Sequence, residues 1–382
     1  MGHRLIEDYL GRRARAYGGE RALLVDVVSP GSDETERMAE LRSLAATAGV
    51  LVLGTVVQHQ PHPHPGTFFG RGKAGEIRDL GHSLQADTLI VGSEVSPAQA
   101  RNLEEATGLK VVDRSQLILD IFAQRAGTKE AALAVELAQL EYLLPRLRGW
   151  GQALTDPGAG IGTSGPGETR LEQGRRAVRH RIQVVRHELR KAAQDRAIQQ
   201  ARRRRAGPPE IVLVGYTNSG KSTLFNRLTG SDVLVEDKLF ATLDTRVRQV
   251  AWPTGEALVT DTVGFIRDLP HELVPAFQAT LGAVRDAAAL LLVLDVTAPA
   301  AEDHLRVVRE VIADVLGPDR VPPPTLHVLN KLDLVSTQEQ EARLAALERE
   351  AVPHVVVSAK TGGNVASLLS ALDSILTVRS RG

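Results

Sequence analysis

The 382-residue sequence contains no cysteine. Disulfide bonds, thiolate catalysis and cysteine-based metal sites are therefore excluded, and the composition fits a reducing compartment. The chain also lacks a run of about 18 uncharged apolar residues, the length that a membrane-spanning helix needs. Its first twenty residues interleave charged and apolar side chains and contain no apolar core of a signal peptide. We expect a soluble, cytoplasmic, monomeric protein that does not enter a membrane.

An excess of charge of either sign is also missing, because 46 basic residues balance 46 acidic ones. The balance is uneven: residues 166–205 hold thirteen Lys or Arg against four Asp or Glu, a net charge of +9. Attraction between charges reaches only about 8 Å in physiological salt, so this local excess matters more than the total. A solvated helical face would explain it, but a polyanionic partner is favoured. Aromatic residues are scarce there, so folded RNA fits better than stacked single strands.

Residues 20–125 alternate β-rich runs with amphipathic stretches, which is the pattern of a small parallel α/β domain. The expected strands cover residues 21–28, 50–58, 86–92 and 109–113. The expected helices cover residues 34–49, 72–84 and 96–108, the last with Ser96 as its N-cap and Pro97 at the first helical position.

The segment 59–76 is rich in Pro, Gly and His and predicts a loop. His59, His62 and His64 could suggest a metal site. The prolines between them prevent a shared helical face and no fourth ligand is evident, so we do not favour one.

Two apolar seams with helical spacing follow. The first comprises Leu133, Leu137, Leu140, Leu144 and Leu147, and the second comprises Leu171, Val178, Ile182, Val185, Leu189 and Ala192. Each seam alone would be exposed to water, so we expect an antiparallel helical hairpin. The glycine-dense connection 149–169 is either a flexible surface loop or a tip that orders against a partner. The expected domains are an N-terminal α/β domain (1–127), the hairpin (128–205) and a doubly wound α/β domain (206–382).

A phosphate-binding loop follows a β-rich run and precedes a helical segment. Its pattern is G-x-x-x-x-G-K-S from Gly215 to Ser222, and a chance match to this motif in this setting is improbable. Backbone N–H groups at the helix start would bind phosphate, Lys221 would reach the β- and γ-phosphates, and Ser222 would ligate Mg²⁺.

The segment Asn330-Lys331-Leu332-Asp333 predicts guanine recognition, because the Asp333 carboxylate can accept from the ring N–H and exocyclic amine of guanine. Ser358-Ala359-Lys360 would close over the base. Between these motifs, Asp261 ends a strand where it can hold the Mg²⁺ shell through water, and the Gly264 N–H can sense the γ-phosphate. Thr242 and Thr245 are both candidates for the second metal ligand, and spacing does not separate them.

The catalytic residues that we expect are Lys221, Thr242 and Gly264. The predicted nucleotide contacts are Gly215, Tyr216, Thr217, Asn218, Ser219, Gly220, Lys221, Ser222, Thr223, Phe240, Ala241, Thr242, Leu243, Asp244, Asp261, Thr262, Val263, Gly264, Asn330, Lys331, Leu332, Asp333, Ser358, Ala359 and Lys360. Phe265 occupies the position at which Ras-type enzymes carry a water-orienting glutamine, so slow intrinsic hydrolysis is expected.

These motifs, together with "GPGETRLE", "SPAQARNLE" and "VELAQLEYLLPRLRG", resemble the HflX family within the translation-factor class of GTPases. The resemblance implies an N-terminal α/β domain with a helical hairpin followed by a G domain. It implies a GTPase that binds the large (50S) ribosomal subunit and its rRNA, is stimulated by it, and in some members splits ribosomes under stress. It also implies that Thr242, rather than Thr245, joins Ser222 as a Mg²⁺ ligand.

Alternatives remain open at this stage. One is a GTP-regulated switch that recruits a protein partner, and another is an RNA-modulating NTPase that also uses ATP, against which the guanine-reading motif argues. Related GTPases with an Asn at the position of Asn218 use K⁺ to supply positive charge, so K⁺ is a candidate second cation.

Overall fold

The computed structural model describes residues 19–31, 33–147, 170–204, 207–231, 239–240, 242–243, 245–252, 255–268, 282–318, 320–349 and 352–380. They fall into two compact units, which are described separately. Unit 1 consists of Met1–Gln124 and Ala132–Arg190, and unit 2 of Arg125–Ala131 and Lys191–Gly382. The connection 149–169 lies outside the described residues. No helix within the described ranges is long and apolar enough to cross a membrane.

Unit 1 contains a four-stranded parallel sheet with the strand order β2-β1-β3-β4. Its elements are β1 (Arg21–Val28), α2 (Glu34–Ala48), β2 (Leu51–His59), α3 (Arg71–Leu84), β3 (Thr88–Val91), α4 (Pro97–Thr107), β4 (Lys110–Asp113), α5 (Arg114–Arg125), α6 (Lys129–Arg146) and α7 (Arg170–Arg204). The residues of α5 and α6 within Arg125–Ala131, and those of α7 from Lys191, belong to unit 2. The predicted strands and helices of the α/β domain are confirmed. Ser96 caps α4 as expected, in a reciprocal pair with Gln99.

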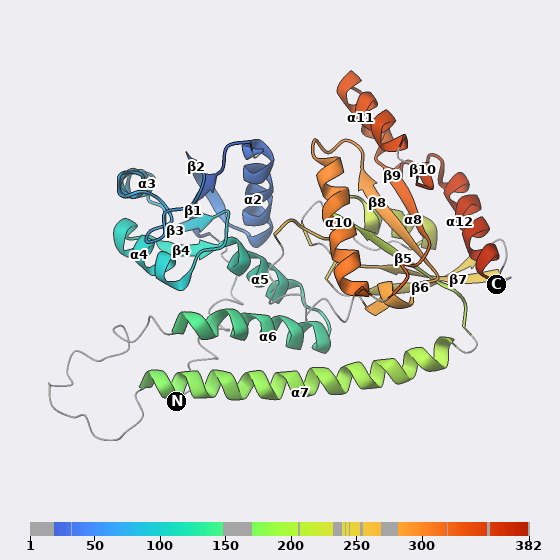
Figure 1. The fold of residues 1–382 in the computed structure, drawn as a ribbon, viewed down its shortest axis with the longest axis horizontal. Coiled ribbons are helices and arrows are strands. Elements are labelled where there is room, and N and C mark those ends of the chain that lie inside the picture. The colour runs from blue at the N-terminus through green and yellow to red at the C-terminus, as the bar shows by residue number, and fades with distance from the viewer. Residues whose placement is uncertain are drawn as a thin grey trace. The chain divides into compact units, whose positions relative to one another are not determined.

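Helix α5 was not predicted from the sequence. Its residues from Arg114 to Phe122 are all buried, so the segment has no exposed face and no amphipathic period. Helices α3 and α4 pack on one face of the sheet with alternate residues of β1, including Leu23 and Val25. Figure 1 shows α2 on the other side of that sheet.

Helices α6 and α7 pack side by side (Figure 1). Their shared core contains Leu133, Leu137, Leu140, Leu143, Leu147, Val178, Ile182 and Val185, with Leu144 and Leu189 packed against it. The C-terminal half of α6 faces the N-terminal half of α7, because Glu141 and Leu144 line one pocket with Arg176 and Arg186. The predicted antiparallel pairing is therefore present. The side chain of Leu171 lies outside the described residues, and Ala192 is half-buried outside this core.

A buried carboxylate joins α6 to the sheet of unit 1. Asp113, at the end of β4, accepts hydrogen bonds from the Tyr142 hydroxyl (2.8 Å), the Arg146 guanidinium (3.0 Å) and the Gln116 backbone N–H (2.8 Å). The Arg146 guanidinium also lies over the Tyr142 ring, 3.4 Å from its centroid. This cluster fixes the end of α6 that precedes the 149–169 connection.

Unit 2 contains a six-stranded sheet with the order β10-β9-β8-β5-β7-β6, in which all pairs are parallel except β6–β7. Its elements are β5 (Glu210–Gly215), α8 (Lys221–Thr229), β6 (Arg246–Trp252), β7 (Gly255–Asp261), β8 (Ala289–Asp295), α10 (Ala301–Leu316), β9 (Thr325–Asn330), the 3₁₀ helix η3 (Leu332–Leu334), α11 (Gln338–Glu348), β10 (His354–Val356) and α12 (Val365–Ser380). The α/β class that the sequence predicts is confirmed.

The core of unit 2 places α8 and α12 on the same face of the sheet, because Leu224, Phe225, Leu368 and Leu372 share one cluster with Leu213 of β5. Figure 1 shows α10 on the opposite face. Because β5, β7, β8 and β9 run parallel, their carboxyl ends meet at one edge of the sheet. Open α/β sheets bind their ligands at this edge.

We expect Asp113→Ala to destabilise unit 1 by about 3 kcal/mol, because it leaves the poorly exposed Arg146 guanidinium without its carboxylate. Thermal unfolding of the full chain, followed by circular dichroism, measures the effect. The matched control is Asp79→Ala, which removes an exposed ion pair with Arg78 and should change stability little. Equal effects of the two substitutions would contradict the role given to Asp113.

Candidate functional site

The phosphate loop connects β5 to α8, and Lys221 begins the helix. The Lys221 side chain is buried, and its Nζ donates to the carbonyl oxygens of Gly215 (3.1 Å) and Tyr216 (2.8 Å). Burial lowers the pKa of Lys221 to about 8, and the charge of Asp261 opposes this shift. The Lys221 amine therefore remains mostly in its protonated form at neutral pH, and the two carbonyl oxygens hold it beneath the phosphate loop.

Two glycines allow neighbouring segments to pack tightly against the phosphate loop. Gly220 has a φ of +93°, and a Cβ there would lie 2.3 Å from Asn330 Nδ2. A Cβ on Gly264 would lie 2.8 Å from the Thr217 Cα and 3.0 Å from Lys221 Nζ. Any side chain at these positions would separate the loop from its neighbours.

Three oxygen-bearing side chains converge beside Lys221. The Ser222 Oγ lies 2.9 Å from the Thr242 Oγ1, and both contact the Asp261 Oδ2, at 2.8 and 3.2 Å. Burial raises the pKa of Asp261, while Lys221 and the two hydroxyls act in the opposite direction. Thr245, the other candidate from the sequence, is exposed and is not part of this cluster.

Some polar atoms of this region have no partner. Within the described part of the chain, Asp261 Oδ1, Thr217 Oγ1 and Ser219 Oγ are buried without a hydrogen bond. Buried polar atoms usually find partners, so unsatisfied ones at this edge indicate a polar ligand. Oxygen donors of this kind suit Mg²⁺ with a bound phosphate.

The segment Asp261–Phe265 is fixed against the phosphate loop through its backbone. The Phe265 N–H donates to the Gly215 carbonyl (3.0 Å), and the Phe265 carbonyl accepts from the Thr217 N–H (2.7 Å). The Phe265 ring is 1% exposed, so it packs into the core. Two residues further, the Arg267 N–H donates to the Tyr216 hydroxyl (2.9 Å), and the Tyr216 ring stacks on His304 of α10 at 3.8 Å.

The predicted guanine-reading residues surround one buried amide. Asn330 Nδ2 donates to the Ser219 carbonyl (2.9 Å), and Asn330 Oδ1 accepts from the Ala359 N–H (3.0 Å). Asp333 is exposed and accepts from the Ser358 hydroxyl at 2.5 Å. The phosphate loop and the loop after β10 are therefore joined through Asn330.

Lys331 is oriented by a carboxylate at the end of β8. Its Nζ lies 2.8 Å from Asp295 Oδ2, and the other oxygen of Asp295 accepts from the N–H and the hydroxyl of Thr297. The sequence contained a signal for Asp295, because a polar residue that ends a buried parallel strand lies at the ligand-binding edge. Arg227 and His304, which also contact this site, had no such signal.

Other predicted contact residues are present near the site with their side chains turned into the protein. Val263, Phe240 and Leu243 are buried, and the Thr262 hydroxyl donates to the Leu213 carbonyl. Only their backbones could therefore meet a nucleotide. Asn218 and Lys360 are exposed, and Thr223 and Leu332 are half-buried. Ala241 and Asp244 lie outside the described residues.

The histidines of the segment 59–76 are not gathered into a metal site. His59 pairs with Glu34 at 2.6 Å, and His64 Nδ1 accepts from the Gly66 N–H within its own loop. Within the described ranges, no group of three or more His, Cys, Asp or Glu could hold a metal ion. The loop itself is shorter than predicted, because β2 continues to His59 and α3 begins at Arg71.

The buried lysine of the phosphate loop, its glycines and the oxygen cluster of Ser222, Thr242 and Asp261 define a P-loop GTPase. Comparisons with known proteins agree. Residues 35–123, 125–203 and 210–331 match the family models described as GTP-binding GTPase N-terminal, GTP-binding GTPase Middle Region and 50S ribosome-binding GTPase.

Curated relatives support this assignment. GTPase HflX of Caldanaerobacter subterraneus subsp. tengcongensis is 49% identical over 83% of this chain and 73% of its own length. GTPase HflX of Escherichia coli is 42% identical over 94% of this chain and 83% of its own. The chain belongs to the HflX family of GTPases. A crystal structure of SsGBP with GDP is similar at 26% identity with a TM-score of 0.51, covering 94% of this chain and 99% of that one.

Gly264→Ala should slow GTP hydrolysis by about 10²-fold, the usual cost of losing one donor to the transition state. The added methyl group would collide with Thr217 and Lys221 and displace the Gly264 N–H. GDP binding should weaken less than hydrolysis slows, because GDP has no γ-phosphate for that N–H to contact. Single-turnover hydrolysis and nucleotide titration measure the two quantities. Gly282→Ala is the control, because a Cβ there meets nothing within 4 Å. Unchanged hydrolysis in Gly264→Ala would exclude Gly264 from the reaction.

Proposed function

We propose that this GTPase associates with the large ribosomal subunit, that the subunit stimulates GTP hydrolysis, and that the protein splits or rescues ribosomes under stress. The family model matching residues 210–331 carries the description 50S ribosome-binding GTPase, which supports the first part. We also propose the division into an α/β domain (1–127), a hairpin (128–205) that reaches rRNA, and a G domain (206–382).

The proposed reaction is in-line attack of water on the γ-phosphate. Lys221 would stabilise charge on the β- and γ-phosphates, and the Gly264 N–H would donate to the γ-phosphate. Ser222 and Thr242 would hold Mg²⁺, since their hydroxyls converge beside the unpartnered Asp261 Oδ1. When bound, Mg²⁺ neutralises the charge that develops on the phosphate oxygens. Asn330 and Asp333 would select guanine.

The proposal that GTP hydrolysis depends on a partner rests on the position of Phe265. Its ring is buried, and both of its backbone polar groups are bonded to the phosphate loop. A phenyl ring can neither orient nor deprotonate water. Its burial also means that this position has no access to the γ-phosphate unless the backbone moves. Fast hydrolysis therefore requires a group from a partner, a reordered switch or a cation.

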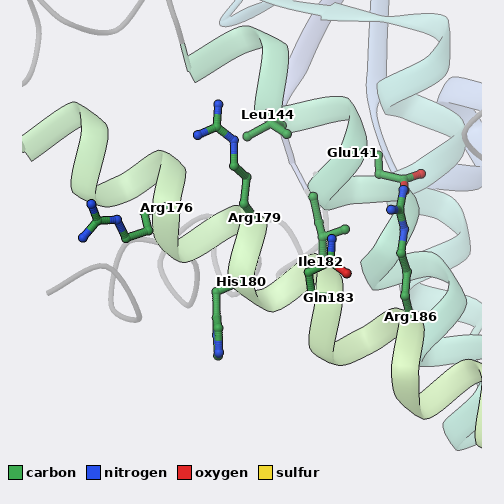
Figure 2. A pocket seen from close by; sticks show the side chains of 8 residues that line it. All are labelled: Glu141, Leu144, Arg176, Arg179, His180, Ile182, Gln183 and Arg186. Atoms are coloured by element: carbon green, nitrogen blue, oxygen red, sulfur yellow. The ribbon is translucent and has the colours of Figure 1, made fainter.

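The surface proposed to meet RNA lies on α7 of unit 1. A pocket there has a volume of about 470 Å³. Figure 2 shows the side chains that line it: Glu141, Leu144, Arg176, Arg179, His180, Ile182, Gln183 and Arg186. Its lining holds three arginines against one glutamate, a formal excess of positive charge that would attract phosphate groups. Arginine side chains bind phosphate oxygens in bidentate fashion, and each phosphate neutralised releases counterions.

The structure revises one expectation about this charge. The sequence shows few acids within 166–205, but two glutamates of α6 supply partners to α7. Arg181 forms a bidentate pair with Glu136 (2.6 and 2.8 Å), and Arg186 lies 2.6 Å from Glu141. Arg175 and Arg179 lie 3.6 and 3.7 Å from Glu172. Part of the +9 charge therefore stabilises the hairpin and does not attract a polyanion.

Purified large subunits should raise GTP turnover roughly tenfold or more, because activating groups supplied in trans can contribute up to about 10³–10⁵ in P-loop GTPases. Arg176→Ala/Arg179→Ala should weaken subunit binding and reduce the slope of log affinity against log salt by about one per lost phosphate contact. Sedimentation with subunits over a range of KCl concentrations measures this slope.

The matched control for that experiment is Arg320→Ala/Arg349→Ala, which removes two positive charges from exposed positions of unit 2. It should leave binding and its salt slope unchanged. If large subunits fail to stimulate hydrolysis and the Arg176/Arg179 variant behaves as wild type, the GTP-regulated protein switch becomes the better description. Sucrose gradients of 70S ribosomes with the GTP-bound protein test whether subunits separate.

We propose in addition that K⁺ near Asn218 supplies part of the missing positive charge. The Asn218 side chain is exposed at the phosphate loop, and the hydroxyl of its neighbour Thr217 is buried without a partner among the described residues. Amide and hydroxyl oxygens are suitable ligands for a hard cation. Intrinsic turnover should be several-fold faster in KCl than in NaCl of equal ionic strength, and Asn218→Ala should remove the difference. Equal rates in both salts would exclude this cation.

A further inference from the structure

Arg227 lies on α8, the helix that Lys221 begins, and it contacts the loop that follows β10. Its Nε donates to the Ala359 carbonyl (3.2 Å), and its terminal NH2 donates to the Lys360 carbonyl (2.5 Å). The two bonded carbonyls are consecutive, and the planar guanidinium presents its donors in a fixed fork. This contact joins residues 132 positions apart in the sequence.

The same loop is held from its other side. The Ala359 N–H donates to Asn330 Oδ1 (3.0 Å), and the Ser358 hydroxyl donates to Asp333 (2.5 Å) and accepts from the Thr361 N–H (3.1 Å). The next residue after these, Gly362, has a φ of +87°, and a Cβ there would lie 3.6 Å from the Arg227 guanidinium carbon. The loop is therefore bonded both to Arg227 and to Asn330 and Asp333.

The planarity of the peptide unit between Ala359 and Lys360 determines where the Lys360 N–H points. In a trans peptide unit the carbonyl and the N–H point in opposite directions. Because Arg227 holds the Ala359 carbonyl, the Lys360 N–H in the same unit points away from α8. That N–H donates no hydrogen bond within the described part of the chain, so it is an available donor beside Asn330 and Asp333.

We propose that Arg227 is a positioning residue for base selectivity. By fixing the carbonyls of Ala359 and Lys360, it aims the Lys360 N–H at the purine 6-position. Guanine has an acceptor oxygen there, whereas adenine has an amino donor that would oppose the N–H. Since α8 begins at Lys221, the same helix aligns the base-reading loop with the phosphate loop. This inference rests on the proposed assignment of Ser358–Lys360 to the base.

The test is nucleotide affinity in the full chain for GDP, IDP and ADP, measured for the wild type, Arg227→Ala and Arg227→Lys. IDP keeps the oxygen at position 6 but lacks the exocyclic amine that Asp333 would read. Arg227→Ala should weaken GDP and IDP by a similar factor, about tenfold for one misdirected hydrogen bond, and leave ADP unchanged. Arg227→Lys should recover part of the loss, because an ammonium can donate to one of the carbonyls but lacks the fork.

Arg285→Ala is the matched control, because Arg285 Nε donates to the Val315 carbonyl (2.7 Å) at the end of α10. It removes an arginine–carbonyl bond in the same unit without touching the base-reading loop. Melting temperatures of both variants are compared. Arg285→Ala should retain wild-type selectivity between GDP and ADP, and if Arg227→Ala retains it as well, Arg227 acts through stability alone.

The outcomes distinguish a failure of the base-site assignment from a failure of the positioning role of Arg227. If wild-type protein binds ADP as tightly as GDP, the base-site assignment fails. If the wild type prefers GDP but Arg227→Ala weakens GDP and ADP equally, or weakens neither, the base-site assignment stands and the positioning role of Arg227 is wrong. A loss confined to GDP and IDP, absent from Arg285→Ala, is the result expected from the positioning role.

Discussion

The buried ammonium of Lys221 is the constraint on which the nucleotide-binding edge of unit 2 depends. A buried charge is costly unless hydrogen-bonding groups and an opposite charge compensate it. Here the Gly215 and Tyr216 carbonyls turn inward to accept from it, and Asp261 provides the opposing charge. The carbonyl of Gly215 in turn accepts from the Phe265 N–H. One buried charge thus determines the course of the phosphate loop and of the segment that follows β7.

This constraint explains why Phe265 is compatible with the site. Its backbone, rather than its side chain, contacts the phosphate loop, and the ring fills space in the core. Gly264 must lack a side chain because Lys221 and Thr217 are so close. The arrangement is suited to binding a nucleotide and poorly equipped to orient water. The proposed dependence of hydrolysis on an external group rests on that geometry.

Charge has a different role in unit 1. Composition alone presents residues 166–205 as a strongly basic segment, but Arg181 and Arg186 are paired across the hairpin with glutamates of α6. Pairs of this kind contribute modestly to stability when exposed, and they reduce the field that a polyanion would meet. The positive surface proposed for RNA is therefore narrower than the sequence suggests and centres on the pocket beside Arg176 and Arg179.

The sequence by itself determined the α/β class, the hairpin seams and the phosphate loop, because alternation, helical spacing and the G-x-x-x-x-G-K-S pattern are encoded within short windows. It could not determine α5, since a helix buried on every side has no periodic face. Spacing alone left Thr242 and Thr245 open, and the family resemblance favoured Thr242, which the tertiary structure places beside Ser222. Only the tertiary structure brought Arg227 to Ala359 and His304 to Tyr216. These contacts join residues far apart in the chain. Their formation depends on how the helices and loops pack around the sheet, which no local pattern records.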